Sequence, residues 1–308
     1  MAQKLTQVVE ARRRGRALAA PALLLVPGVG LIAIFMFVPI LLTIWLSFHA
    51  WSTQTPFSAV RFIGFDNFAD LFGPTSVGRD FRNAFANTAA YAVLSIVLIL
   101  PLSIALGVLI HQSRAIGRGA LRAILFSTYM VPSMAVALVW SKLYSPTEGP
   151  YNQMLSWLGL PGSDWLSSPD TALVSLVLLN VWQQAGYFTV LAVAGLTQIP
   201  FSLYEAATLD GAARWQTFSH VTLPLLRRTL LFSSVIALIN AVQVFEPVAL
   251  ITQGGPVGST NVLTYHIRRV GIERTQGGLG SAMAVMLLLT LVATVAVLFA
   301  AARERSSR

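Results

Sequence analysis

The chain has 308 residues, of which 55% are hydrophobic and only 11% charged, and its mean hydropathy is +0.69. An ordinary soluble domain carries about 25% charged residues, and a soluble surface this apolar would self-associate, so the composition predicts a membrane protein. The formal charge of +9 does not indicate nucleic-acid binding, because the basic residues lie at the ends of apolar runs. The absence of cysteine excludes disulfides, thiolate metal sites and cysteine nucleophiles.

Six apolar stretches are each long enough to cross a bilayer, whose hydrocarbon core of about 30 Å needs about 20 helical residues. Proline lacks the N–H that an interior helical position donates, so Pro21, Pro27 and Pro39 in the first stretch and Pro132 in the third predict kinks. We therefore expect an all-α, polytopic membrane protein with six transmembrane helices. The stretches cover residues 19–48, 84–110, 120–143, 171–197, 225–252 and 278–302.

Lysine and arginine are enriched in cytoplasmic loops, so their distribution predicts which side of the membrane each connection faces. A cytoplasmic N-terminus places twice as many of them inside as outside, which predicts that both termini and the segment 198–224 are cytoplasmic. The inside residues are Lys4, Arg12, Arg13, Arg14, Arg16, Arg114, Arg118, Arg122, Arg214, Arg227, Arg228, Arg303, Arg305 and Arg308. The outside residues are Arg61, Arg79, Arg82, Lys142, Arg268, Arg269 and Arg274.

The polar break between the fourth and fifth stretches is the most informative segment. It contains Glu205-Ala206-Ala207, then Asp210-Gly211-Ala212, and after a spacer Val221-Thr222-Leu223-Pro224. This set and its spacing resemble the cytoplasmic coupling loop of ABC-transporter permease subunits, where a separate ATPase docks. The resemblance implies that Leu223 and Pro224 lead the chain back into the membrane. It implies that the ATPase contacts are Glu205, Ala206, Ala207, Asp210 and Gly211.

Polar residues in the outer part of the fifth stretch form a candidate solute path. Asn240, Gln243 and Glu246 are spaced by three and would share one broad helical face, with Phe245 beside them. A charge in hydrocarbon costs about 2.5–3.5 kcal/mol on insertion scales, so Glu246 is expected to face protein or water. Amides and carboxylates bind sugar hydroxyls and rings stack on sugar faces, which indicates a carbohydrate path. Polar contacts that only hold helices together are the alternative.

The fourth stretch supplies a candidate second wall for this path. Asn180, Gln184 and Tyr187 are separated by four and three residues, which places them on one face of a helix. Gln183 is expected to point away from that face, a position from which it can meet a partner permease. The two walls together would give a polar route through an otherwise apolar protein.

A second resemblance lies at the end of the fifth stretch. Sugar-type permeases often carry a Phe-Asp pair, an apolar stretch, then Thr-x-Gly-Gly-Pro and a further Thr. Here Phe245-Glu246-Pro247 precedes Thr252-Gln253-Gly254-Gly255-Pro256 and Thr260, with Glu246 in place of the Asp. Gly64-Phe65-Asp66-Asn67-Phe68 also looks like a segment that follows the first helix in that family. The resemblance implies that an outward loop contacts a solute-binding protein through Gly254, Gly255, Pro256 and Thr260.

The chain thus resembles a permease subunit of the binding-protein-dependent sugar and glycerol-phosphate importers, in the branch of the maltose-type first permease. The resemblance implies a type I ABC importer membrane domain over residues 19–302, between a basic cytoplasmic tail at 1–18 and a cytoplasmic tail at 303–308. It implies a prokaryotic cytoplasmic membrane location. The implied partners are a second, distinct permease, a cytosolic ATPase dimer that holds ATP and Mg²⁺, and an extracytoplasmic solute-binding (lipo)protein.

The sequence contains no GxxxxGK[ST], HExxH or GxSxG motif, so the chain is expected to be no enzyme and to hold no cofactor or metal of its own. Two other interpretations stay open. The same machinery would serve glycerol-3-phosphate or a glycerophosphodiester, which the outside residues Arg268, Arg269 and Arg274 suit. A proton-coupled secondary transporter that uses Glu246 is the alternative from another class, and the coupling segment argues against it.

Overall fold

The computed structural model describes residues 25–112 and 118–304, most of which are helical. The predicted basic tail at residues 1–18, the start of the first apolar stretch and residues 305–308 lie outside the described residues. So do several of the basic residues used to predict orientation. These are Lys4, Arg12, Arg13, Arg14, Arg16, Arg114, Arg305 and Arg308.

Four helices in the described part of the chain are long and apolar enough to cross a membrane without a break. The first, Leu25–Leu46, holds the π turn η1 (Ala33–Phe37) and helix α2 (Val38–Leu46), whose first turn accommodates Pro39. The other three agree with the second, fourth and sixth predicted stretches. They are α4 (Ser76–Gln112), α8 (Pro169–Leu196) and α14 (Gly277–Glu304).

The third and fifth predicted stretches are sharply bent. Helices α5 (Arg118–Met130) and α6 (Ser133–Leu143) meet at 94° around Pro132, where the sequence predicts a kink. The segment Arg214–Leu225, which ends in α11 (Leu223–Leu225), meets α12 (Arg227–Val242) at 68°. If each bent pair is one span, residues 25–112 and 118–304 hold six spans, as predicted.

The fifth predicted stretch, 225–252, is not one continuous helix. Helix α12 ends at Val242, and a second helical turn, η4 (Val248–Thr252), follows Pro247. Proline has no N–H to donate, and its ring would clash with the carbonyl four residues earlier, so a helix cannot run through Pro247 unbroken. The carbonyl of Val244 instead accepts a hydrogen bond from Thr264 Oγ1. A backbone acceptor at membrane depth is satisfied in this way.

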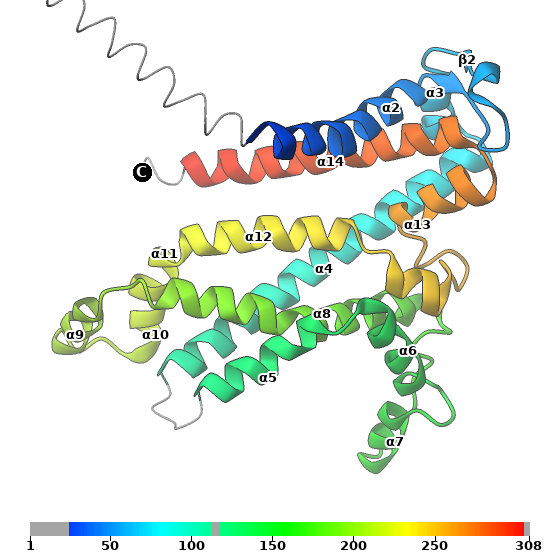
Figure 1. Ribbon diagram of the computed structural model, residues 1–308. Helices are drawn as coiled ribbons and strands as arrows, with labels where there is room; N and C mark the ends of the chain where they lie inside the picture. The colour runs from blue at the N-terminus through cyan, green and yellow to red at the C-terminus, as the bar shows by residue number, and fades with distance from the viewer. Residues whose placement is uncertain (1–24, 113–117, 305–308) are drawn as a thin grey trace, which may run out of the picture.

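The remaining elements gather at the two ends of the bundle (Figure 1). At one end the predicted coupling segment forms α9 (Phe201–Leu209), α10 (Arg214–Thr217) and the π turn η3 (Phe218–Thr222). The predicted outside loops form short elements at the other end. These are the antiparallel strands β1 (His49–Ala50) and β2 (Arg61–Phe62), η2 (Phe57–Ala59), α3 (Asp66–Phe72), α7 (Pro150–Trp157), α13 (Leu263–Arg268) and η5 (Arg269–Glu273).

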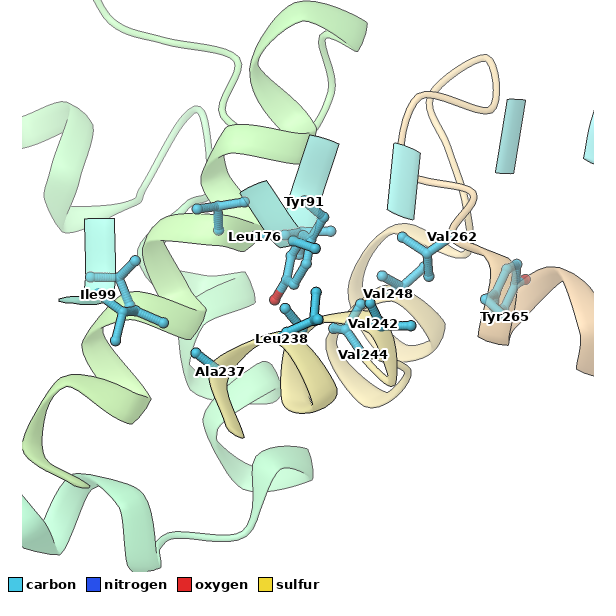
Figure 2. Close-up of a cluster of buried hydrophobic side chains, with 14 of the residues drawn as sticks. Tyr91, Ile99, Leu176, Ala237, Leu238, Val242, Val244, Val248, Val262 and Tyr265 are labelled. Atoms are coloured by element: carbon cyan, nitrogen blue, oxygen red, sulfur yellow. The ribbon is translucent and has the colours of Figure 1, made fainter. Parts of the chain in front are cut away.

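The core forms where α4, α8 and α12 pack against one another. Tyr91 of α4, Leu176 of α8 and Leu238 of α12 belong to one buried cluster, and Figure 2 shows their side chains meeting. Close approach of α5 to α8 depends on a glycine, because a Cβ on Gly186 would lie 1.7 Å from the carbonyl oxygen of Leu125. Helix α8 is therefore the central element, and it sets the positions of its neighbours.

The first and last spans form an outer pair that packs lightly on this core. Helices α2 and α14 lie side by side (Figure 1), and only 6% and 11% of the most apolar windows of their spans are buried. Asn67, from the segment that resembles the permease signature after the first helix, fixes the outer end. Its Nδ2 donates to the carbonyls of Ser47 at 2.9 Å and His49 at 3.1 Å. The exposed apolar faces of this pair require lipid or further membrane helices as neighbours.

Gly186→Ala is expected to destabilise the α5–α8 contact, because the added methyl group would overlap a backbone carbonyl. Overpacking lowers the free energy of unfolding by about 1–3 kcal/mol, and a clash with backbone places this variant at the upper end of that range. The loss is measured as a lower melting temperature in detergent. Gly119→Ala is the matched control, since a Cβ there meets nothing within 4 Å. Alanine favours the helix more than glycine, so this control should melt no lower than wild type. Equal melting temperatures for the two variants would contradict the packing.

Candidate functional site

A polar cavity of about 470 Å³ lies where the two bent spans face α8. Its walls come from the α5–α6 corner, the middle of α8 and the break after α12. The volume falls within the range of about 300–1,000 Å³ that is usual for small-molecule sites. Five side-chain amides and one carboxylate line it. Its polar residues are Tyr129, Ser133, Asn180, Gln183, Gln184, Asn240, Gln243 and Glu246.

Three of the amides form a hydrogen-bonded chain that ties α4, α8 and α12 together. Asn180 Nδ2 donates to Ser95 Oγ at 3.1 Å, and Gln184 Nε2 donates to Asn180 Oδ1 at 2.7 Å. Asn240 Nδ2 then donates to Gln184 Oε1 at 2.9 Å. The predicted shared face of Asn180 and Gln184 is confirmed. These three amides hold helices together, as the alternative interpretation of polar contacts requires.

The expectation that Gln183 points away from the cavity is wrong. Gln183 is buried and lines the cavity, and its Nε2 donates to the carbonyl of Val131 at 3.1 Å and to Ser133 Oγ at 3.3 Å. The cause is the break at Pro132, which leaves the Val131 carbonyl outside a helix, and a backbone acceptor at membrane depth needs a donor. Pro132 in the third stretch was visible in the sequence, and it indicated that a nearby side chain would have to donate to the freed carbonyl.

Besides the exposed Tyr129 hydroxyl, the cavity groups whose polar ends make no hydrogen bond in the described ranges are the side chains of Gln243 and Glu246. Both side chains are exposed, and neither makes a hydrogen bond or an ion pair within residues 25–112 and 118–304. They do not share a helical arc with Asn240 as predicted, because α12 ends at Val242. The corner that replaces the helix nevertheless brings Asn240, Gln243 and Glu246 to the same cavity.

Two predicted path residues lie outside the cavity lining. Tyr187 packs behind the cavity, with its ring stacked on that of Tyr129 at 4.6 Å between centroids. Phe245 lies on the opposite side of the corner, where the Arg268 guanidinium is 5.7 Å from its ring centroid. The prediction that Phe245 lines the same path as Glu246 is wrong, because its ring lies under Arg268 in a separate hollow that Thr264 and Ile267 also line.

The charged and titratable groups near Phe245 are already engaged. Arg268 pairs with Glu273 at 3.2 Å and also lies over the Phe245 ring. Burial lowers the pKa of His266 to about 4, because desolvation disfavours the charged imidazolium. His266 is therefore neutral near pH 7. Neither residue lines the polar cavity.

The Gly-Gly-Pro turn has a buried base and an exposed tip. Gly254 is buried at φ +80, a conformation that glycine adopts without strain. Thr260 is fully buried, and its Oγ1 donates to the Gly255 carbonyl at 2.6 Å. The prediction that Gly254 and Thr260 contact a partner is therefore wrong, since both hold the turn from within. Pro256 is partly exposed, and the next residue, Val257, is 93% exposed.

The coupling segment projects from the opposite end of the bundle as a short helix and a tight turn (Figure 1). Glu205, Ala206 and Ala207 lie on α9, which has no buried residue. After Asp210 the chain reverses at Gly211, whose φ of +75 needs a glycine. The Ala212 N–H donates to the Ala207 carbonyl at 2.9 Å and closes the turn.

The base of the coupling segment is anchored to the bundle. Tyr204 of α9 and Thr222 of η3 share a hydrogen bond at 3.3 Å between their hydroxyls. Leu223 and Pro224 form α11 directly before the 68° bend into α12, and Leu226 at that bend is 1% exposed. The exposed turn is thus joined through short helical elements to the span that ends at the cavity.

Residues 100–306 match the family described as "Binding-protein-dependent transport system inner membrane component". The match covers more than half of the chain and contains the coupling segment and all of the polar cavity lining. The chain belongs to this family. The predicted family is confirmed. The chain is a membrane protein, and the description of its family states that transport depends on a binding protein.

Relatives and a solved structure agree with this assignment. The trehalose/maltose transport system permease protein MalF of Thermococcus litoralis is 32% identical over 288 residues, 92% of this chain and 93% of the relative. The diacetylchitobiose uptake system permease protein NgcF of Streptomyces coelicolor is 31% identical over 274 residues, 86% of this chain and 77% of the relative. The crystal structure of a bacterial ABC transporter involved in the import of the acidic polysaccharide alginate contains a similar chain. It has a TM-score of 0.79 at 27% identity, covering 97% of this chain and 99% of that one.

These comparisons confirm the predicted fold, the type I ABC importer membrane domain, over almost the whole chain. Its relatives are permease subunits and not enzymes. A proton-coupled secondary transporter built around Glu246 is set aside by the family match.

Gln184→Leu is expected to destabilise the permease, because it leaves Asn180 Oδ1 and Asn240 Nδ2 without their partner. An unsatisfied buried polar group costs roughly 1–3 kcal/mol, which thermal unfolding in detergent would detect. Gln243→Leu is the matched control, an amide of the same cavity that has no side-chain partner in the described ranges. Its melting temperature should equal that of wild type. Equal losses in both variants would contradict the division between anchoring and free amides.

Proposed function

We propose that this permease carries a sugar-type solute across the cytoplasmic membrane as half of the translocation path of an ATP-driven importer. The observation that carries the proposal is the polar cavity, where Gln243 and Glu246 stay free beside an amide chain. Amides and carboxylates bind hydroxyl groups as donors and acceptors. The relatives named for trehalose/maltose and for diacetylchitobiose support the same solute class.

Within this path the residues divide into two groups. Asn180, Gln184 and Asn240 hold the wall of the cavity through their mutual hydrogen bonds. Gln243 and Glu246 would meet the solute. Tyr187 and Phe245 would act from behind, the first by stacking on Tyr129 and the second by fixing the corner.

The coupling segment is proposed to dock on a cytosolic ATPase that holds ATP and Mg²⁺. Leu209 and Trp215 are 89% and 72% exposed, and apolar side chains of this size at the tip of a polar segment suit a protein interface. Glu205, Ala206, Ala207, Asp210 and Gly211 would form the contact. Leu223 and Pro224 would pass its movement to α12 through the bend at Leu226. Docking then alternates the access of the cavity between the two sides of the membrane.

The assembly would contain a second, distinct permease and an ATPase dimer, with both termini of this chain in the cytoplasm. The second permease would cover the lightly packed outer pair, α2 and α14. An extracytoplasmic binding protein would deliver solute at the end that carries Pro256 and the exposed Val257. Glycerol-3-phosphate and glycerophosphodiesters receive no support from the cavity, because no Lys, Arg or His lines it.

Gly211→Asp is expected to reduce ATP-driven uptake at least about tenfold, equivalent to about 1.4 kcal/mol of docking free energy. The carboxylate would stand in open space at the proposed contact, since a Cβ at Gly211 meets nothing within 4 Å. Uptake is measured in proteoliposomes that hold the complete transporter and its binding protein, with the variant's melting temperature beside it.

Gly159→Asp is the matched control for this variant. Gly159 has φ +71 and equally open surroundings, so aspartate there meets the same backbone strain as at Gly211. Gly159 lies directly after α7, at the end of the bundle opposite the coupling segment (Figure 1). The control should keep wild-type uptake. Wild-type uptake by Gly211→Asp would contradict the docking proposal.

A further inference from the structure

We infer that Glu246 makes the cavity select against anionic solutes, so that the permease carries neutral or amino-bearing saccharides. The inference rests on the proposed carbohydrate function and adds the charge class of the solute. Similarity leaves this charge open, because one relative is named for trehalose and maltose and a solved relative imports acidic alginate.

The carboxylate of Glu246 is uncompensated in the cavity. The lining contains no Lys, Arg or His, and Glu246 is its one carboxylate. Glu246 makes no ion pair within residues 25–112 and 118–304. Charges interact more strongly where a solute has displaced water. A solute carboxylate or phosphate is therefore repelled, and an ammonium group is attracted.

The hydrogen-bonding capacity of the cavity points to the same solutes. Four of the five amides are already bonded within the protein: Asn180, Gln183, Gln184 and Asn240. A solute therefore meets the free groups of Gln243, Glu246 and Tyr129. The amide and the hydroxyl can donate to any solute oxygen, so the discrimination lies with Glu246, whose carboxylate accepts from a hydroxyl or an ammonium N–H and donates nothing to an anion. Anion sites use guanidinium groups or backbone N–H groups instead.

The corner holds Glu246 towards the cavity. On the opposite side of the same corner, Phe245 lies under Arg268 and the Val244 carbonyl accepts from Thr264. These contacts fix the two residues before Glu246, and Pro247 restricts the backbone after it. Arg268 is itself paired with Glu273 at 3.2 Å. It stabilises the corner and leaves the Glu246 carboxylate unneutralised.

The absence of cysteine from the chain allows a direct test in the assembled transporter. In a Gln243→Cys variant, the rates of thiol modification by a trimethylammonium-ethyl and a sulfonato-ethyl thiosulfonate are measured on this chain by mass spectrometry. Each rate is divided by that of a free thiol. The cationic reagent should be favoured at least about tenfold, a free-energy difference of about 1.4 kcal/mol. Glu246→Gln in the same background should remove most of that preference.

Glu148→Gln is the control, because this exposed carboxylate lies beside α7 and outside the cavity, and it should leave the ratio unchanged. An unchanged ratio in Glu246→Gln would overturn the inference, because Glu246 would then be paired by a partner subunit or turned away. The readout needs no sugar. A transporter can show the expected preference for the cationic reagent and still take up neither maltose nor a glucosamine disaccharide. That result would overturn the proposed function and leave the inference about the charge of the cavity standing.

Discussion

The need to satisfy backbone groups at membrane depth shapes the functional part of this permease. Two spans break, one at Pro132 and the other before Pro247, and each break leaves a carbonyl outside a helix. Gln183 supplies a donor to Val131, and Thr264 supplies one to Val244. Irregular backbone at this depth is tolerated where it is buried in protein or lines a cavity. The polar cavity is the space that these two corners and α8 enclose.

The same breaks connect the cavity to both ends of the molecule. Helix α12 begins at the bend below the coupling segment and ends at the corner that carries Glu246. The corner is in turn held by α13, through Thr264 and Arg268, next to the Gly-Gly-Pro turn. The turns at Gly211 and at the exposed Val257 are thus connected to the cavity through short, hydrogen-bonded elements.

The sequence predicted the continuous spans well, because long apolar runs leave little choice in a bilayer, and α8 and α14 agree with the expected ranges. The coupling turn at Gly211 was also predicted, since a glycine is required there. The errors lie at the breaks. Pro247 indicated a break, but helical spacing was carried up to it although α12 ends at Val242, which misplaced Phe245 and assumed one arc for Asn240, Gln243 and Glu246. Gln183 and Thr260 were misplaced because their partners come from segments distant in sequence or from a compact turn.

Co-purification of this chain from gently solubilised native membranes tests most directly whether it works only as part of a larger importer. Mass spectrometry of the material bound to the tagged chain should identify a P-loop ATPase, a second permease and a solute-binding protein in stoichiometric amounts. Recovery of the chain alone, from membranes in which other multisubunit complexes survive the same detergent, would contradict the account.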